Sequence, residues 1–181
     1  METIPFNRDK FLNVIHYACS KCDPHELGRV KLHKILYFSD MLHFAETGEP
    51  LTGAEYQKQQ FGPVAKHLGW GLDKLSEQGR VRVEKTSYFG YDKFSFFSER
   101  SISDNQFSHR EKKLLDDVID FVCDRSAAEI SELSHNRAWH AAEMGETIPY
   151  FTAYDLFPCE ITGADLDWGH REAERVLAQR R

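Results

Sequence analysis

Apolar residues recur at helical intervals along the first quarter of the chain. Between Phe11 and Ala18 they share one face, which predicts a helix over residues 8–22 that ends before Pro24. A second helix is predicted over residues 27–46. Apolar side chains surround most of the circumference of this second helix, so we expect it to be buried on several sides and to form the spine of the fold.

Proline, glycine and alternating residues organise the next part of the chain. Residues 51–60 are largely polar and are expected to form a turn with a short extended or helical piece. Because proline loses no hydrogen bond in the first turn of a helix, Pro63 is expected to open a helix that ends at Gly79. Apolar and polar residues then alternate over 81–97, which predicts a β-hairpin. A helix followed by a hairpin is also the plan of a winged helix.

Shorter helices are predicted for the last third of the chain. Residues 114–122 carry a helical apolar stripe, and Ser126 with Glu129 forms a capping-box pattern at the start of the next helix. A further helix is predicted over residues 137–144, and a weakly amphipathic one over residues 163–179. This last helix is expected to dock on the body, to pair with a partner or to fray.

These elements predict a mainly α protein, a compact single-domain helical bundle with one small β-hairpin and a winged-helix-like alternative for the helix and hairpin. The 181 residues are 41% hydrophobic, which suffices for one packed domain without disulfides. We expect residues 1–160 to form the helical domain and residues 161–181 to form the C-terminal helix.

The charge pattern narrows the class of partner. The formal net charge is -6, so the chain as a whole lacks the basic footprint of a protein that tracks nucleic-acid phosphates. An acidic surface suits a basic protein partner. The sequence has neither a secretory leader pattern nor an apolar run long enough to span a membrane, so we expect a cytoplasmic protein.

The four cysteines are few and irregularly placed, which argues against a secreted disulfide scaffold. Cys19 and Cys22 have the C-x-x-C spacing of a zinc or redox site. Neither Cys123 nor Cys159 belongs to a second such pair, whereas a structural zinc site needs four ligands. Two ordinary reduced cysteines near a helix end are therefore the favoured interpretation, and no metal or cofactor is expected.

The sequence offers little support for catalysis. No nucleophile elbow, phosphate-binding loop or dinucleotide-binding glycine pattern occurs, and no two histidines are spaced as a helical metal clamp. Asp116 and Asp120 lie one turn apart, but on the polar side of an amphipathic helix, where solvated charge is the usual explanation. We therefore expect a binding protein and not an enzyme.

Three sequence blocks together resemble a known family. The first is KLHKILYF at residues 31–38 with the following GEPL at residues 48–51, and the second is FGPV at residues 61–64. The third comprises Ser134-His135, Trp139 and residues 145–150. In this order and spacing, over roughly residues 11–150, they resemble the Panacea domain of SocA-like antitoxins and of the phage-associated proteins named after GepA.

The resemblance implies an antitoxin that binds and neutralises a cognate protein toxin encoded beside it. The SocA type also delivers its toxin to the ClpXP protease, and both modes stay open for this chain. Unlike antitoxins with a DNA-binding head and a disordered neutralising tail, the chain has no long polar tail. Neutralisation would therefore use a folded surface.

The resemblance and the pattern together give two sets of candidate residues. The fold signature comprises Leu32, Leu36, Tyr37, Phe61, Gly62 and Pro63. The candidates for partner binding are Lys31, Lys34, Tyr56, Tyr88, Phe89, Tyr91, His135 and Trp139. Tyr88, Phe89 and Tyr91 are chosen because a hairpin tip can hardly bury three aromatic rings.

The partner-binding candidates also have structural interpretations. Lys31 and Lys34 are three residues apart and are expected to form a solvated edge of the central helix, with contact to an acidic group of the partner as the alternative. Trp139 is expected to fill the core, and His135 to bond to a neighbouring group. The alternative to a binding tip is that at least two of the hairpin aromatics fold back onto the body.

A DNA-binding transcriptional regulator is the alternative function. It would use the helix and hairpin over residues 63–97, where seven lysine, arginine and histidine side chains occur. Four acidic residues are interleaved with these bases and dilute any positive stripe. DNA contact is therefore the less favoured interpretation, either alone or as autoregulation beside antitoxin activity.

Overall fold

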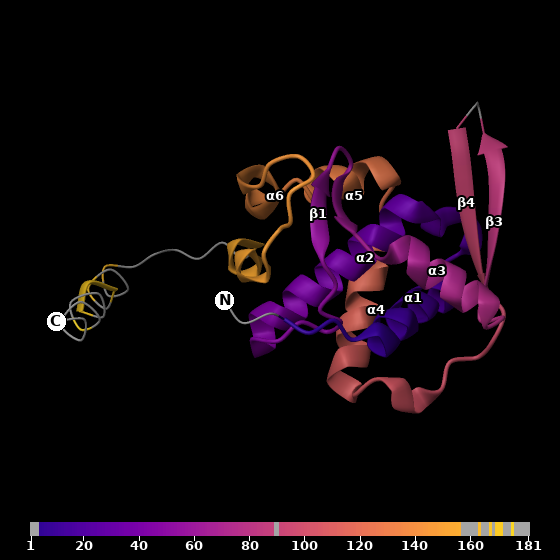
Figure 1. The fold of residues 1–181 in the computed structure, drawn as a ribbon, viewed down its shortest axis with the longest axis horizontal. Helices are drawn as coiled ribbons and strands as arrows, with labels where there is room; N and C mark the ends of the chain where they lie inside the picture. The colour runs from indigo at the N-terminus through magenta and orange to yellow at the C-terminus, as the bar shows by residue number, and fades with distance from the viewer. Residues whose placement is uncertain are drawn as a thin grey trace.

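A computed structural model describes residues 4–88 and 91–156, together with six positions of the C-terminal segment. The described part is mainly α-helical, with two small two-stranded antiparallel sheets, as expected except for the second sheet (Figure 1). The six C-terminal positions, 163, 167, 169–171 and 175, are helical. The rest of the expected C-terminal helix lies outside the described residues.

Helix α2 (Pro24–Thr47) is the centre of the fold. Helix α1 (Arg8–Lys21) precedes it and packs against it. Asp23 caps the start of α2 by accepting a hydrogen bond from the backbone of His25, and the helical conformation is interrupted at Gly28. Six large apolar side chains of α2 are at most 1% exposed, which confirms the expected buried spine: Leu27, Leu32, Ile35, Leu36, Tyr37 and Met41.

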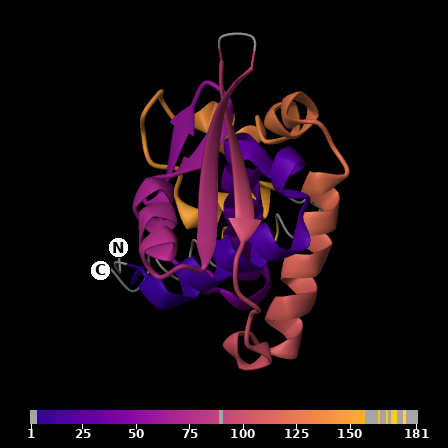
Figure 2. The ribbon, with the colours of Figure 1, turned by 90° about the vertical axis from the view of Figure 1, so that its right-hand side faces the viewer.

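The predicted β-hairpin is present. Strand β3 (Val81–Tyr88) pairs with β4 (Tyr91–Ser98), and the hairpin follows helix α3 (Leu68–Glu77). Its base packs on α2 and α1, where Phe96 is fully buried, while its far end projects beyond the helices (Figure 2).

The second sheet corrects the expectation for Pro63. Strand β1 (Tyr56–Gln59) pairs with β2 (Gly62–Ala65), so Pro63 lies opposite Lys58 in a strand and does not open a helix. A proline is tolerated there because each strand of a two-stranded sheet has only one neighbour, which leaves one edge without ladder bonds. Helix α3 begins only at Leu68.

The last third of the described body wraps one side and one end of α2. Helix α4 (His109–Cys123) follows the 3₁₀ turn η1 (Asp104–Gln106) and packs along α2, and α5 (Ala127–Leu133) covers the end of the body beside it (Figures 1 and 2). The predicted capping box of Ser126 and Glu129 is confirmed. Helix α6 (Arg137–Ala141) is shorter than expected, and the 3₁₀ segment η2 (Tyr150–Leu156) packs back on α2.

Candidate partner-binding surface

A buried lysine joins the three sequence blocks. Lys34 of α2 is 1% exposed, and its Nζ donates a 2.8 Å hydrogen bond to the carbonyl oxygen of Pro63 in β2. Gly62 has a φ of 88°, and a Cβ atom there would meet Ser134 Oγ at 2.1 Å and Lys34 Nζ at 2.8 Å. Burial lowers the pKa of Lys34 to about 7. Residues of the three sequence blocks thus form a tightly packed junction between α2, the β1–β2 turn and the end of α5.

The expected solvated lysine edge is wrong. Lys31 is also buried, and its Nζ donates a hydrogen bond to the carbonyl oxygen of Cys123 at the end of α4. Both lysines therefore bond to backbone oxygens from elsewhere in the chain. Sequence spacing does not reveal these acceptors, because they lie far from the lysines along the chain.

Tyr56, a partner-binding candidate, belongs to a second buried cluster. Its hydroxyl donates to Asp40 Oδ2 at 2.7 Å, and the Tyr150 hydroxyl reaches the same oxygen at 3.0 Å. The backbone and hydroxyl of Thr52 also donate to Asp40. Asp40 is fully buried, and burial raises the pKa of its carboxyl group. This cluster fastens β1 and the start of η2 to α2 and leaves Tyr56 inside the core.

Trp139 and His135 form a partly exposed stack beside the turn between β1 and β2. Their ring centroids are 4.0 Å apart, and Lys58 Nζ lies 4.0 Å from the centroid of the Trp139 ring on the strand side. The indole Nε1 donates to the carbonyl oxygen of Gln59. Both rings are half-buried, so Trp139 packs against the core without being enclosed by it.

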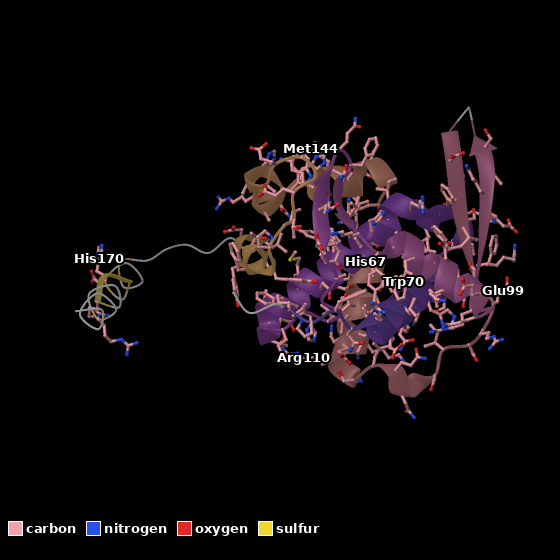
Figure 3. All side chains as sticks on the ribbon, viewed as in Figure 1. His67, Trp70, Glu99, Arg110, Met144 and His170 are labelled. Carbon is pink, nitrogen blue, oxygen red and sulfur yellow. The ribbon has the colours of Figure 1, made fainter. Side chains whose placement is uncertain are left out.

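Three exposed apolar side chains lie on the segments that adjoin this stack. Phe61 at the β1–β2 turn is 60% exposed, Leu133 at the end of α5 is 51% exposed, and Met144 after α6 is 61% exposed. Backbone bonds from Gly145 to Lys58 and from Lys58 to Glu146 hold the Met144 loop against β1, and Figure 3 shows Met144 at the end of the molecule that carries this turn. We call Phe61, Leu133, Trp139 and Met144 the turn patch.

Leu133 also belongs to an adjacent groove. The groove has a volume of about 630 Å³ and runs between α2 and α4, closed at its sides by α5, the start of α6 and η2. Phe121 of α4 is 40% exposed on it. We call this cavity the α2–α4 groove; its other apolar lining residues are Phe38, Leu42, Leu114, Val118 and Leu156.

The hairpin was expected either to bind the partner through its tip or to contact DNA, and the described residues support neither role as well as they support the turn patch. Phe89 lies outside the described residues, and the side chains of Tyr88 and Tyr91 are not described, so the tip stays a prediction. The bases expected to contact DNA are largely engaged by acids: Arg82 with Glu84 and Glu99, Lys85 with Asp92, Lys66 with Glu55, and Lys74 with Glu77. Such pairing reduces the positive field that phosphate binding requires.

In the described part of the chain, no three histidine, cysteine or acidic side chains are grouped to hold a metal ion. Cys19 and Cys22 are free and buried, and burial raises the pKa of Cys19 to about 12. None of the described helices is long and apolar enough to cross a bilayer.

Comparison with known proteins gives one match. The family model for SocA-like antitoxins, the Panacea domain, matches residues 32–140, which is more than half of the chain. The match begins at the buried face of α2 and ends after the Trp139 stack, so it includes the Lys34 junction and most of the turn patch. No curated protein and no solved structure matches the chain.

Proposed function

The chain belongs to the family of SocA-like antitoxins with a Panacea domain, and from this membership we propose that it binds and neutralises a cognate protein toxin. The proposal is for a binding protein without catalytic activity of its own. A folded surface occludes the toxin, and delivery of the captured toxin to ClpXP is an optional second step.

The turn patch is the observation that carries this proposal. Large apolar side chains exposed together on a soluble surface mark sites of protein association. Phe61, Leu133 and Met144 come from three segments that contact one another before any partner arrives. The Lys34 bond fixes the Phe61 turn to α2, Gly62 packs closely against Ser134 beside Leu133, and backbone bonds join the Met144 loop to β1. A surface organised in advance loses little conformational entropy on binding.

The patch and the adjacent groove provide an apolar centre for an interface of ordinary size. A stable protein interface buries about 800 Å² on each partner and depends on a few well-packed anchors. Phe61 and Trp139 are anchors of the aromatic kind that such interfaces favour. Charged residues around them would form the rim.

Co-expression with a neighbouring reading frame tests the function directly. The frame beside this gene is induced alone, with this chain, and with a variant carrying Phe61→Ser and Met144→Ser. We expect lethality alone, growth with the unaltered chain, and lethality with the variant at equal protein levels. Growth that does not depend on this chain would refute the antitoxin proposal.

A further inference from the structure

The α2–α4 groove has the shape of a site for a third helix. Phe38, Leu42 and Glu46 follow each other at one-turn intervals along α2, and Leu114, Val118 and Phe121 do so along α4. The stripe on α2 extends for about 12 Å, or slightly more than two helical turns. Two ridges of this length lying side by side leave a groove into which the ridge of a third helix fits.

The two helices run in opposite directions, which gives the groove two distinct ends. The rings of Phe38 and Phe121 meet at one end, with centroids 6.0 Å apart. Arg110 and Glu46 form an ion pair at the other end. The lining elements are helices and a 3₁₀ segment, so the groove offers no strand edge to which an extended peptide would add.

Charge along the groove favours a basic occupant. Its ionisable lining residues are Glu46, Asp117, Asp155 and Arg137, three acids and one base. Lys113 and Arg110 pair with Asp117 and Glu46 from exposed positions, and such surface pairs contribute little and exchange readily. Within the described residues, Asp155 has no ion pair.

We propose that the α2–α4 groove binds an amphipathic helix of the partner, with an apolar stripe of two to three turns flanked by lysine or arginine. The identification of that partner as the toxin rests on the proposed function; the groove and its ligand class do not. The basic side chains lie towards Glu46, Asp117 and Asp155. The helix C-terminus points towards Arg137, which stands beside Asn136 at the Phe38 end and complements the negative pole of a helix.

A displayed library of random peptides of about 18 residues, or five helical turns, provides the test, with the full chain as bait. Enriched peptides are synthesised, and their affinities for four proteins are measured by fluorescence anisotropy. The proteins are the unaltered chain, Phe121→Asp and Asp155→Lys in the groove, and Phe151→Asp, a matched aromatic that is 59% exposed and does not line the groove. Far-ultraviolet circular dichroism confirms that all four are folded.

We expect enriched peptides to carry apolar residues at helical intervals and an excess of lysine and arginine. Phe121→Asp should weaken their binding about tenfold or more, because an anchor pocket is lost and a charge is buried, and Phe151→Asp should not. Asp155→Lys should weaken binding by a smaller factor that shrinks in high salt.

Several outcomes would overturn the groove proposal. The first is that no peptide is enriched, which is expected if residues 157–181 of the chain already fill the groove. The second is that Phe121→Asp leaves peptide binding unchanged. A dimer in light scattering that Phe121→Asp converts to a monomer would assign the groove to a second copy. Toxin neutralisation that persists in Phe121→Asp would leave the antitoxin function standing without the groove, whereas peptide binding without neutralisation would leave the groove standing alone.

Discussion

Lys34 and Pro63, 29 residues apart, are joined by a buried hydrogen bond of 2.8 Å from the lysine Nζ to the proline carbonyl oxygen. The bond attaches the β1–β2 turn to the central helix, two residues after the exposed ring of Phe61. Gly62 lies between them and leaves no room for a side chain. Buried signature residues therefore fix the position of an exposed residue of the proposed interface.

The amine of Lys34 should make folding stability depend on pH. Its pKa falls to about 7 in the folded protein because burial disfavours the charge, whereas an unfolded lysine stays protonated to pH 10.5. Between these values the unfolded chain binds more protons, so this residue adds stability as pH rises. From pH 7 to 9 the free energy of unfolding should increase by about 2 kcal/mol relative to Lys34→Met.

Urea denaturation of both proteins at several pH values measures that difference. Using Lys34→Met as the reference cancels the titration of cysteines and tyrosines common to both chains. Curves that stay parallel from pH 7 to 9 would show that Lys34 keeps its proton inside the fold.

Gly62→Ala should destabilise the protein strongly. The residue has a positive φ, and the new methyl group would collide with the hydroxyl of Ser134, which is itself fixed by a 2.6 Å bond to the carbonyl oxygen of Ser131. We expect a loss of about 3 kcal/mol, combining backbone strain and overpacking. Gly48→Ala is the matched control, since Gly48 has a φ of 80° but open space around it, and should cost about 1 kcal/mol. Equal losses in chemical denaturation would contradict the steric role of Ser134.

Local sequence signals predicted the elements whose structure depends on near neighbours. The central helix, the hairpin over residues 81–97 and the capping box of Ser126 and Glu129 follow from periodicity and short spacings. The strands β1 and β2 do not, because their residues are polar or contain proline, and pairing is what makes them strands.

The candidate site is harder to predict from the sequence, because its geometry also depends on contacts between residues that are distant along the chain. Lys31 and Lys34 read as solvated because their acceptors, the carbonyl groups of Cys123 and Pro63, are distant in sequence. The sequence blocks place Phe61 in the fold signature, yet its side chain is exposed. An aromatic residue preceding Gly-Pro in a turn was the available signal, since a tight turn rarely encloses its own side chains.

Asp40→Asn should weaken the core. Asp40 Oδ2 accepts hydrogen bonds from the hydroxyl groups of Thr52, Tyr56 and Tyr150, and an amide nitrogen in its place cannot accept. The two tyrosine hydroxyls have second acceptors in the carbonyl oxygens of Leu36 and Ala54, whereas the Thr52 hydroxyl would lose its acceptor. We therefore expect a loss of about 2 kcal/mol. Asp116→Asn removes a partly exposed ion pair with Lys21, while its amide oxygen can still accept from Tyr17, and it should cost about 0.5 kcal/mol. Thermal denaturation distinguishes the two; similar losses would mean that the Asp40 cluster is not structurally important.

The turn patch and the hairpin tip make opposite predictions for toxin binding. Phe61 and Met144 are exposed and make no polar side-chain bond, so replacing both with serine should leave the fold intact. If the turn patch is the interface, this variant should bind the toxin about 30-fold more weakly, the loss typical of a removed anchor. Serine at Tyr88, Phe89 and Tyr91 together should then leave the affinity unchanged in calorimetry. The reverse pattern would move the interface to the hairpin tip, because neither variant alters the buried junction of Lys34 that supports the turn.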